Sequence, residues 1–223
     1  MDTKEAIDER HSVRKYFEKS LTVQSREALL SEIKRCNMEG HLHFQLITDE
    51  PKAFSSMFSK AFAGCTNYIA LIGENSDDLE EKCGYYGEQI VLFAQTIGLN
   101  TCWVGGSYKR VRRAMYVGKG EKLVAVIAVG YGKNDGKPHK SKPFEEVSLT
   151  PESECPYWYK AGVESALKAP TALNQQKFVF RYDKQTGLVM AVSGIGFFTA
   201  VDLGIAKYHF EVGSGKNKYI WME

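Results

Sequence analysis

The stretch Lys168-Ala-Pro-Thr-Ala-Leu-Asn-Gln-Gln-Lys-Phe178 organises the interpretation of this sequence. A helix-forming run (Ala161–Leu167) precedes it, and a strand-like run follows it. Pro170 cannot continue a helix, and the residue before a proline is pushed out of the α region. The stretch therefore predicts a loop. Its Thr171 hydroxyl and Asn174 amide either cap their own chain or bind something other than backbone.

A weaker counterpart of this stretch occurs in the first part of the chain. Sliding the sequence by 134 positions places Phe44 on Phe178, and sliding it by 106 places Gly98 on Gly204. The two offsets differ by 28 residues, which a missing segment in the second copy would explain. We interpret this pattern as an internal duplication with one shortened copy. The proline loop occurs only in the second copy.

Composition restricts the class of protein. The chain has 223 residues, 43% of them hydrophobic, which is enough to bury a sizeable core. A net charge of +2 argues against a nucleic-acid or membrane-surface partner. No run approaches the ~18 apolar residues of a membrane span, and the N-terminus lacks the apolar centre of a signal peptide. Five scattered cysteines without CxxC spacing indicate reduced thiols, so we expect a cytoplasmic protein with no metal site.

Arg10, Ser12 and Arg14 alternate in the N-terminal segment. An extended chain would point all three side chains to one side. Two guanidinium groups beside a hydroxyl suit the binding of a phosphate, because arginine supplies fork-shaped, charge-assisted donors. The spacing by itself also fits a solvated basic surface turn.

Gly105-Gly106 follows a predicted strand (Thr101–Val104) and precedes a predicted basic helix (Lys109–Met115). Paired glycines at such a turn let backbone N–H groups approach a ligand closely. A tight turn without a ligand is the alternative. The cations of the basic helix either form a solvated face or attract a phosphorylated second substrate.

The predicted buried strand Lys122–Gly130 is followed by a segment rich in glycine, proline and lysine, which is typical of a loop. In this part, Lys140-Ser141-Lys142 again sets two cations around a hydroxyl. Taken alone, the tripeptide indicates a flexible surface loop.

Hydrophobic periodicity and turn residues predict the remaining elements. Those of the first half are a helix at Pro51–Phe62, a central strand at Asn67–Ile72 and a long core helix at Asp77–Ile97. Those of the second half are a hairpin turning at Asp183–Gly187, an apolar helix at Ser193–Gly204, and strands at Lys207–Val212 and Lys218–Trp221.

Taken together, these pieces resemble the flavin-dependent nitroreductase family. The resemblance covers most of the chain and rests on the order of five segments. They are Arg-His-Ser-Val-Arg (10–14), the helix Gly87–Gly98, Leu99–Gly106, Val129-Gly-Tyr with Lys140-Ser-Lys142, and Ala-Pro-Thr-Ala-Leu-Asn (169–174).

The resemblance implies an α+β fold with α/β/α layers, in which mainly antiparallel sheets are flanked by helices. In ordinary members, two subunits build the flavin sites at their interface. This chain is similar to a subfamily in which one polypeptide folds as a pseudo-dimer. Residues 1–150 would form the first half and residues 151–223 the shortened second half. One FMN per chain and a possible monomer follow from that resemblance.

The family's FMN-binding residues carry over position by position. Those matching the phosphate and ribityl contacts are Arg10, Ser12, Lys140 and Lys142. Those matching the contacts of the flavin ring are Arg14 at its pyrimidine edge, Gly105 and Gly106 near N5, and Pro170, Thr171 and Asn174 from the opposite half. The sequence departs from the family at Trp103 and at Gln176-Lys177, which affects the expected shape of the pocket.

The resemblance implies an FMN-dependent oxidoreductase that uses NADH or NADPH. A small electron acceptor of the nitroaromatic or quinone type would then take the hydride from flavin N5. The flavin carries the chemistry, so no catalytic side chain is assigned. The alternative is an FMN-binding carrier or regulatory protein without turnover.

Overall fold

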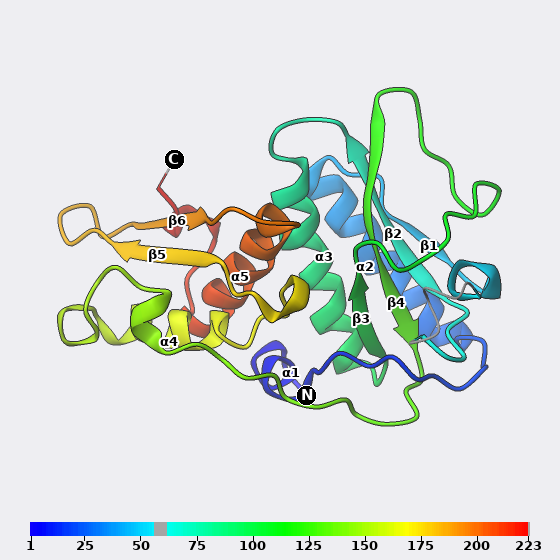
Figure 1. Cartoon of the computed structure of the whole chain (residues 1–223), viewed down its shortest axis with the longest axis horizontal. Helices are drawn as coiled ribbons and strands as arrows, with labels where there is room; N and C mark the ends of the chain where they lie inside the picture. The colour runs from blue at the N-terminus through cyan, green and yellow to red at the C-terminus, as the bar shows by residue number, and fades with distance from the viewer. Residues whose placement is uncertain (56–61, 223) are drawn as a thin grey trace.

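The computed structural model describes residues 1–55 and 62–222 (Figure 1). Its α-helices are α1 (Thr3–Glu9), α2 (Val23–Gly40), α3 (Leu79–Thr96), α4 (Tyr157–Ala166) and α5 (Thr199–Ser214). Its strands are β1 (Gln45–Ile47), β2 (Tyr68–Glu74), β3 (Asn100–Val104), β4 (Glu121–Gly130), β5 (Phe178–Tyr182) and β6 (Val189–Ser193). Its 3-10 helices are η1 (Pro51–Phe54), η3 (Phe144–Glu146), η4 (Glu152–Glu154), η5 (Ala172–Asn174) and η6 (Lys218–Ile220).

The strands of the first half form one antiparallel sheet in the order β1-β2-β4-β3. At its centre, β2 and β4 pair from Tyr68 opposite Ala128 onward. Side chains alternate along β2, so that Ile69 and Leu71 join one hydrophobic cluster while Tyr68 and Ala70 join another. Both faces of the sheet are therefore buried. The strand β3 lies at an edge, so the residues that follow it lie at the margin of the sheet.

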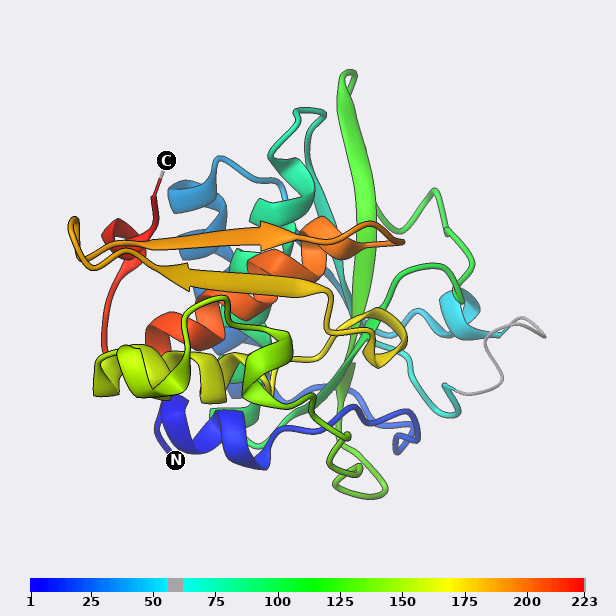
Figure 2. The same ribbon diagram turned by 60° about the vertical axis from the view of Figure 1, so that its left-hand side comes forward.

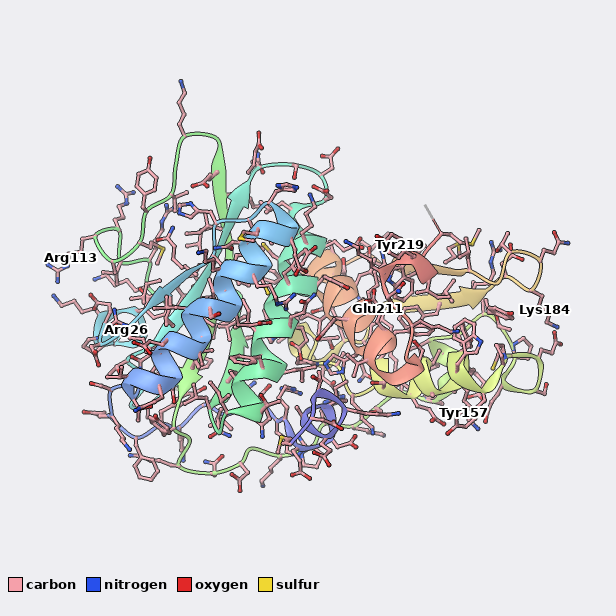
Figure 3. All side chains as sticks on the ribbon, turned by 180° about the vertical axis from the view of Figure 1, so that it is seen from behind. Arg26, Arg113, Tyr157, Lys184, Glu211 and Tyr219 are labelled. Carbon is pink, nitrogen blue, oxygen red and sulfur yellow. The ribbon has the colours of Figure 1, made fainter. Side chains whose placement is uncertain are left out.

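The two faces of the sheet are covered differently. Helices α2 and α3 pack across one face, where Leu29 and Ile90 join the cluster. Figure 3 shows these two helices in front of the sheet. The other face is covered by the N-terminal segment, by η1 and by the chain after β3, through Val13, Phe54 and Val111. Residues that bind a ligand can thus come from extended chain lying on this second face.

Helix α5 joins the second half of the chain to the first. A Cβ added to Gly84 of α3 would collide with the carbonyl oxygen of Val201, and a Cβ at Gly204 of α5 would collide with that of Glu81. Both positions need glycine because the two helix backbones are in contact. Figure 1 shows α3 and α5 between the four-stranded sheet and the hairpin β5–β6, and α4 packs against α5.

Several elements expected from the sequence are confirmed. Strand β2 begins one residue after the start of the predicted Asn67–Ile72 and extends to Glu74, and β4 contains the predicted Lys122–Gly130. The hairpin turns at Asp183–Gly187, where the N–H of Gly187 donates to the carbonyl of Asp183 (2.8 Å). The core helix α3 ends just before Gly98, whose φ of 78° is in the left-handed region. The α+β class with antiparallel sheets is confirmed as well.

The predicted strand Lys207–Val212 is wrong, because this segment forms the second half of α5. Its buried side chains continue a helical spacing that begins earlier, with Val201, Ile205 and His209 four residues apart. This face packs against α3 and α4. The tertiary contacts therefore outweigh the local alternation of large residues that resembles a strand.

The predicted helix Ser193–Gly204 starts too early, since α5 begins at Thr199. Gly204 lies inside α5, whereas Gly98 follows the end of α3. The pairing of these two glycines at an offset of 106 is therefore wrong. Glycine ends one helix but serves the close approach of two helices in the other.

The predicted basic helix Lys109–Met115 is also wrong. The first N–H of this segment donates to the carbonyl of Ala53 (2.7 Å), and only a turn forms farther on. Val111 and Met115 are buried against the sheet. Their helix-like spacing therefore reflects the packing of a loop. Figure 3 shows Arg113 at the outer edge of the molecule.

Two further predicted elements differ from the structure. The predicted strand Lys218–Trp221 forms η6, and Trp221 makes an isolated bridge to Val189. The predicted helix Pro51–Phe62 is a 3-10 helix at Pro51–Phe54. Residues 56–61 of that prediction lie outside the described residues.

Candidate functional site

Two adjoining cavities lie where the N-terminal segment meets the loop after α4. The larger has a volume of about 790 Å³ and the smaller one of about 470 Å³. Ser12 and Arg14 from the first half line both, as do Pro170, Thr171 and Leu173 from the second half. In Figure 2 this loop, drawn in yellow, extends toward the four-stranded sheet. Segments far apart in the sequence therefore form one continuous site.

The N-terminal segment presents its basic residues as the alternation predicts. The N–H of Val13 donates to the carbonyl of Thr101 in β3 (3.0 Å), and Ser12 forms a parallel bridge with the same residue. The Val13 side chain is buried in the cluster on the sheet. Arg10, Ser12 and Arg14 all line the larger cavity. The structure thus brings the three predicted phosphate-binding residues together.

The charge of Arg10 is poorly satisfied by the protein itself. This side chain is 3% exposed, and its Nε atom has no hydrogen-bond partner within the described ranges 1–55 and 62–222. A carboxylate oxygen of Glu88 lies 3.9 Å from that Nε. Burial lowers the pKa of Arg10, and Glu88 acts against this effect. Arg10 is therefore a buried positive charge beside the larger cavity, and such a charge is suited to an anionic ligand.

The loop after α4 has a strained backbone. Leu173, Asn174 and Gln176 have φ angles of 53°, 54° and 44°, where side chains other than glycine cost about 1–3 kcal/mol each. The Gln176 side chain holds the loop in place, since it accepts from the N–H of Lys142 (2.9 Å) and donates to the carbonyl of Lys140 (2.9 Å). Leu173 projects outward and is 96% exposed.

Asp202 in the first turn of α5 holds the same loop from the other side. Its carboxylate accepts from the N–H of Ala172 (2.9 Å) and from the side-chain amide of Gln175 (2.7 Å). Burial raises the pKa of Asp202 to about 6, although these hydrogen bonds act in the opposite direction. The carboxylate lines the smaller cavity and links the loop to α5.

Of the other predicted site residues, Asn174 lines a cavity, whereas Lys140 and Lys142 contact the loop after α4. Asn174 lines the larger cavity, and its amide donates to the carbonyl of Lys140 (2.9 Å). The Lys142 ammonium donates to the carbonyl of Gln176 (3.1 Å). Neither lysine is among the residues that line the two cavities in the described part of the chain. Other basic or imidazole side chains line the larger cavity there: His11, Lys15, Lys137 and His139.

The smaller cavity lies at the margin of the sheet, after β3. Gly105 and Gly106 both line it, together with Trp103. A Cβ at Gly105 would lie 2.5 Å from the ring of Phe198, so glycine lets this ring pack directly on the backbone. A Cβ at Gly106 would have no atom within 4 Å, so its backbone faces open space. The turn therefore has the accessible backbone that the paired glycines predict.

Sequence reasoning missed several residues of the smaller cavity. Phe197 and Phe198 directly precede α5, and Asp202 lies in its first turn. All three fall within the predicted apolar helix Ser193–Gly204. Phe198 has a φ of 58° and precedes the first residue of α5. The signal in the sequence is the glycine pair around this point, Gly194 and Gly196, which indicates a loop.

Comparison with known proteins agrees with this geometry. The model of the family described as "Putative TM nitroreductase" matches residues 2–214. The chain belongs to this nitroreductase family. No curated protein matches the sequence.

Solved structures of nitroreductases show the same fold. The "putative nitroreductase" of Thermotoga maritima has a TM-score of 0.69 and 25% identity, over 96% of this chain and 83% of that one. One from Desulfovibrio desulfuricans, solved in complex with FMN, has a TM-score of 0.55 and 17% identity, over 68% of this chain and 97% of that one. A "Putative NADH Oxidase" of Clostridium acetobutylicum has a TM-score of 0.53 and 19% identity, over 66% of this chain and 99% of that one.

The residues of the site fit the flavin nucleotide expected for a nitroreductase. Arg10 offers a buried positive charge, and Ser12 adds a hydroxyl in the same cavity. Gly106 leaves backbone accessible in the smaller of the two adjoining cavities. An anionic group is thus accommodated at one end and a flat apolar group at the other.

The described residues form neither a metal-binding cluster nor a membrane-spanning helix. Within the described residues, no group of three or more His, Cys, Asp or Glu side chains could hold a metal ion. None of the helices described is both long and apolar enough to cross a bilayer.

Proposed function

We propose that this nitroreductase-family protein is an FMN-dependent oxidoreductase that uses NADH or NADPH to reduce a small acceptor of the nitroaromatic or quinone type. One observation carries the proposal. Residues of the N-terminal segment and of the loop after α4 line the same pair of adjoining cavities. These are the segments whose order resembles the family's flavin-binding motifs.

Each part of the site has a separate role in this proposal. Arg10 and Ser12 hold the FMN phosphate and ribityl chain. The segment with Lys140 and Lys142 holds the loop after α4, through the carbonyl of Lys140 and the ammonium of Lys142. Arg14 lies at the pyrimidine edge of the flavin, where a cation stabilises the anionic reduced ring.

The contacts of the flavin ring complete the proposal. Gly106 and its neighbour Gly105 present backbone toward flavin N5, and Pro170, Thr171 and Asn174 close the site from the second half. Bound FMN would accept a hydride from the nicotinamide and pass it to the acceptor.

The proposal includes a pseudo-dimer within one chain. Gly84 and Gly204 make reciprocal contacts at an offset of 120 positions (204 − 84). The same offset relates the contacted residues, Glu81 and Val201. It also carries the start of α3 at Leu79 onto the start of α5 at Thr199. This offset, in place of 106, supports a duplication about the crossing of α3 and α5.

A third cavity extends this argument. Its volume is about 270 Å³, and it is lined by Asp78, Glu81, Lys82 and Tyr85 of the α3 region, among others. At the same offset of 120, these positions correspond to four that line the smaller flavin-site cavity: Phe198, Val201, Asp202 and Ile205. The third cavity is therefore the counterpart of the flavin site in the other half.

This counterpart is built differently. Lys207 pairs with Glu81 across it, and Tyr85 donates to Glu211 (2.7 Å). Asp78 and Glu81 stand where the flavin site has the apolar Phe198 and Val201. No Arg–Ser–Arg segment precedes the second half. We therefore expect one FMN per chain and a protein that can act as a monomer.

The test is a reaction under anaerobic conditions. The purified protein should bind added FMN and turn yellow, and NADH or NADPH should bleach the oxidised flavin absorbance within minutes. Yellow colour that persists with both donors would instead make the protein a flavin carrier without turnover. Protein that stays colourless in excess FMN would refute the whole proposal.

A further inference from the structure

A buried polar cluster connects the two ends of the candidate site. Glu88 of α3 and His209 of α5 are both fully buried. One oxygen of Glu88 lies 2.9 Å from Nε2 of His209, and the other accepts from the indole N–H of Trp103 (2.8 Å). Trp103 lines the smaller cavity, and Arg10, which lines the larger one, has its Nε 3.9 Å from Glu88.

The hydrogen-bond partners of His209 define how many protons the cluster holds. Its Nδ1 lies 3.2 Å from the carbonyl oxygen of Ser165. A carbonyl oxygen can only accept, so Nδ1 carries a hydrogen. Its Nε2 faces a carboxylate oxygen of Glu88, and a hydrogen must lie between these two atoms as well. His209 and Glu88 therefore share a proton in addition to the one on Nδ1.

This shared proton decides the charge around Arg10. When the shared proton is present, His209 and Glu88 together carry no net charge, whether the proton is on the ring or on the carboxyl group. Arg10 then remains as an uncompensated positive charge beside the larger cavity. Without His209, an ionised Glu88 would stand next to Arg10 in a buried environment. The two opposite charges would then largely cancel.

We propose that His209 is a positioning residue for the phosphate end of the flavin site. Its shared proton neutralises Glu88, and so keeps the buried charge of Arg10 free for a phosphate. The inference rests on the proposed function, because it takes FMN as the ligand. His209 itself touches no ligand, since its side chain is buried where α5 packs against α4 and α3.

The chain offers a matched set of variants. Glu88→Gln can accept from Trp103 and donate to a neutral His209, so every partner stays satisfied and Arg10 keeps its free charge. His209→Gln leaves Glu88 ionised beside Arg10. The double variant His209→Gln/Glu88→Gln removes that carboxylate again. Dissociation constants for FMN and for riboflavin, which lacks the phosphate, are measured for all four proteins by quenching of flavin fluorescence.

We expect His209→Gln to weaken FMN binding about tenfold or more, since a charge-assisted phosphate contact is worth about that much. Riboflavin binding should change less than about threefold, because the apolar end of the site is untouched. The double variant and Glu88→Gln alone should both bind FMN within about threefold of the wild type.

Three results would overturn the inference. Equal weakening of FMN and riboflavin in His209→Gln would mean that His209 acts through packing. Failure of the double variant to recover FMN binding would exclude charge as the cause. A tenfold loss of FMN affinity in Glu88→Gln would also exclude charge as the cause. This result does not depend on the folding of the histidine variant. A wild type that binds FMN no better than riboflavin would instead refute the phosphate site of the proposed function.

Discussion

Replacing Asp202 by asparagine should change how the stability of the protein depends on pH. Asp202 is buried in the first turn of α5, where it accepts hydrogen bonds from Ala172 and Gln175. Burial raises its pKa to about 6 from the ordinary 3.8. The folded protein therefore holds this proton more tightly than the unfolded chain does.

The sign follows from the higher pKa of the folded state. Protonation favours folding, so the contribution is fully present below pH 3.8 and is lost as pH rises to about 6. The difference between the ordinary pKa of 3.8 and the folded pKa of about 6 corresponds to ~3 kcal/mol in the free energy of unfolding. Asparagine cannot ionise and lacks this change. The stability of the wild type relative to Asp202→Asn should therefore fall by up to about 3 kcal/mol between pH 4 and pH 7.

Urea unfolding at several pH values, followed by tryptophan fluorescence without added flavin, measures this difference. Comparing pH values cancels any constant cost of the new amide. Asp183→Asn is the control, because backbone hydrogen bonds lower the pKa of the Asp183 carboxyl group. The stability of the wild type relative to this variant should therefore rise between low and neutral pH, the opposite direction. A difference between wild type and Asp202→Asn that stays flat from pH 4 to pH 7 would refute the reasoning from burial.

Three other predictions concern the site and the fold. Arg14→Ala and Asn174→Ala should each weaken FMN binding about tenfold in a fluorescence titration, because both side chains line the larger cavity. If either variant keeps the affinity of the wild type, the residue replaced in it does not belong to the site. Gly204→Ala should lower the free energy of unfolding, measured in urea, by about 2 kcal/mol, because the new Cβ would collide with the Glu81 carbonyl. An unchanged midpoint of urea unfolding would contradict the close contact of α3 and α5. Flavin absorbance against protein concentration should give about one FMN per chain, and two would contradict the loss of the counterpart site.

The local sequence pattern predicted correctly the strands that are buried on both faces and the turns that need glycine. Strands β2 and β4 are apolar on both sides, and they are buried on both faces of the sheet. The hairpin turn at Asp183–Gly187 and the helix end at Gly98 follow from the backbone freedom of glycine. The alternation of Arg10, Ser12 and Arg14 likewise needs only an extended chain to bring them to one cavity.

Local pattern failed where a distant segment sets the conformation. The segment Lys207–Val212 alternates like a strand but completes α5, because its buried side chains pack on α3 and α4. The segment Lys109–Met115 has helical spacing but is a loop held by the carbonyl of Ala53. In both cases the deciding partner is far away in the sequence, and no window of neighbouring residues contains it.

The sequence by itself determined the family, the order of the motifs and the residues able to bind an anion, because these depend on residue type and spacing alone. Only the tertiary structure decided which of them share a cavity and which charges remain uncompensated. Arg10, Glu88 and His209 are separated by 78 and 121 positions, yet they meet in one buried cluster. The effect of a charge depends on distance and burial, and both are properties of the folded chain.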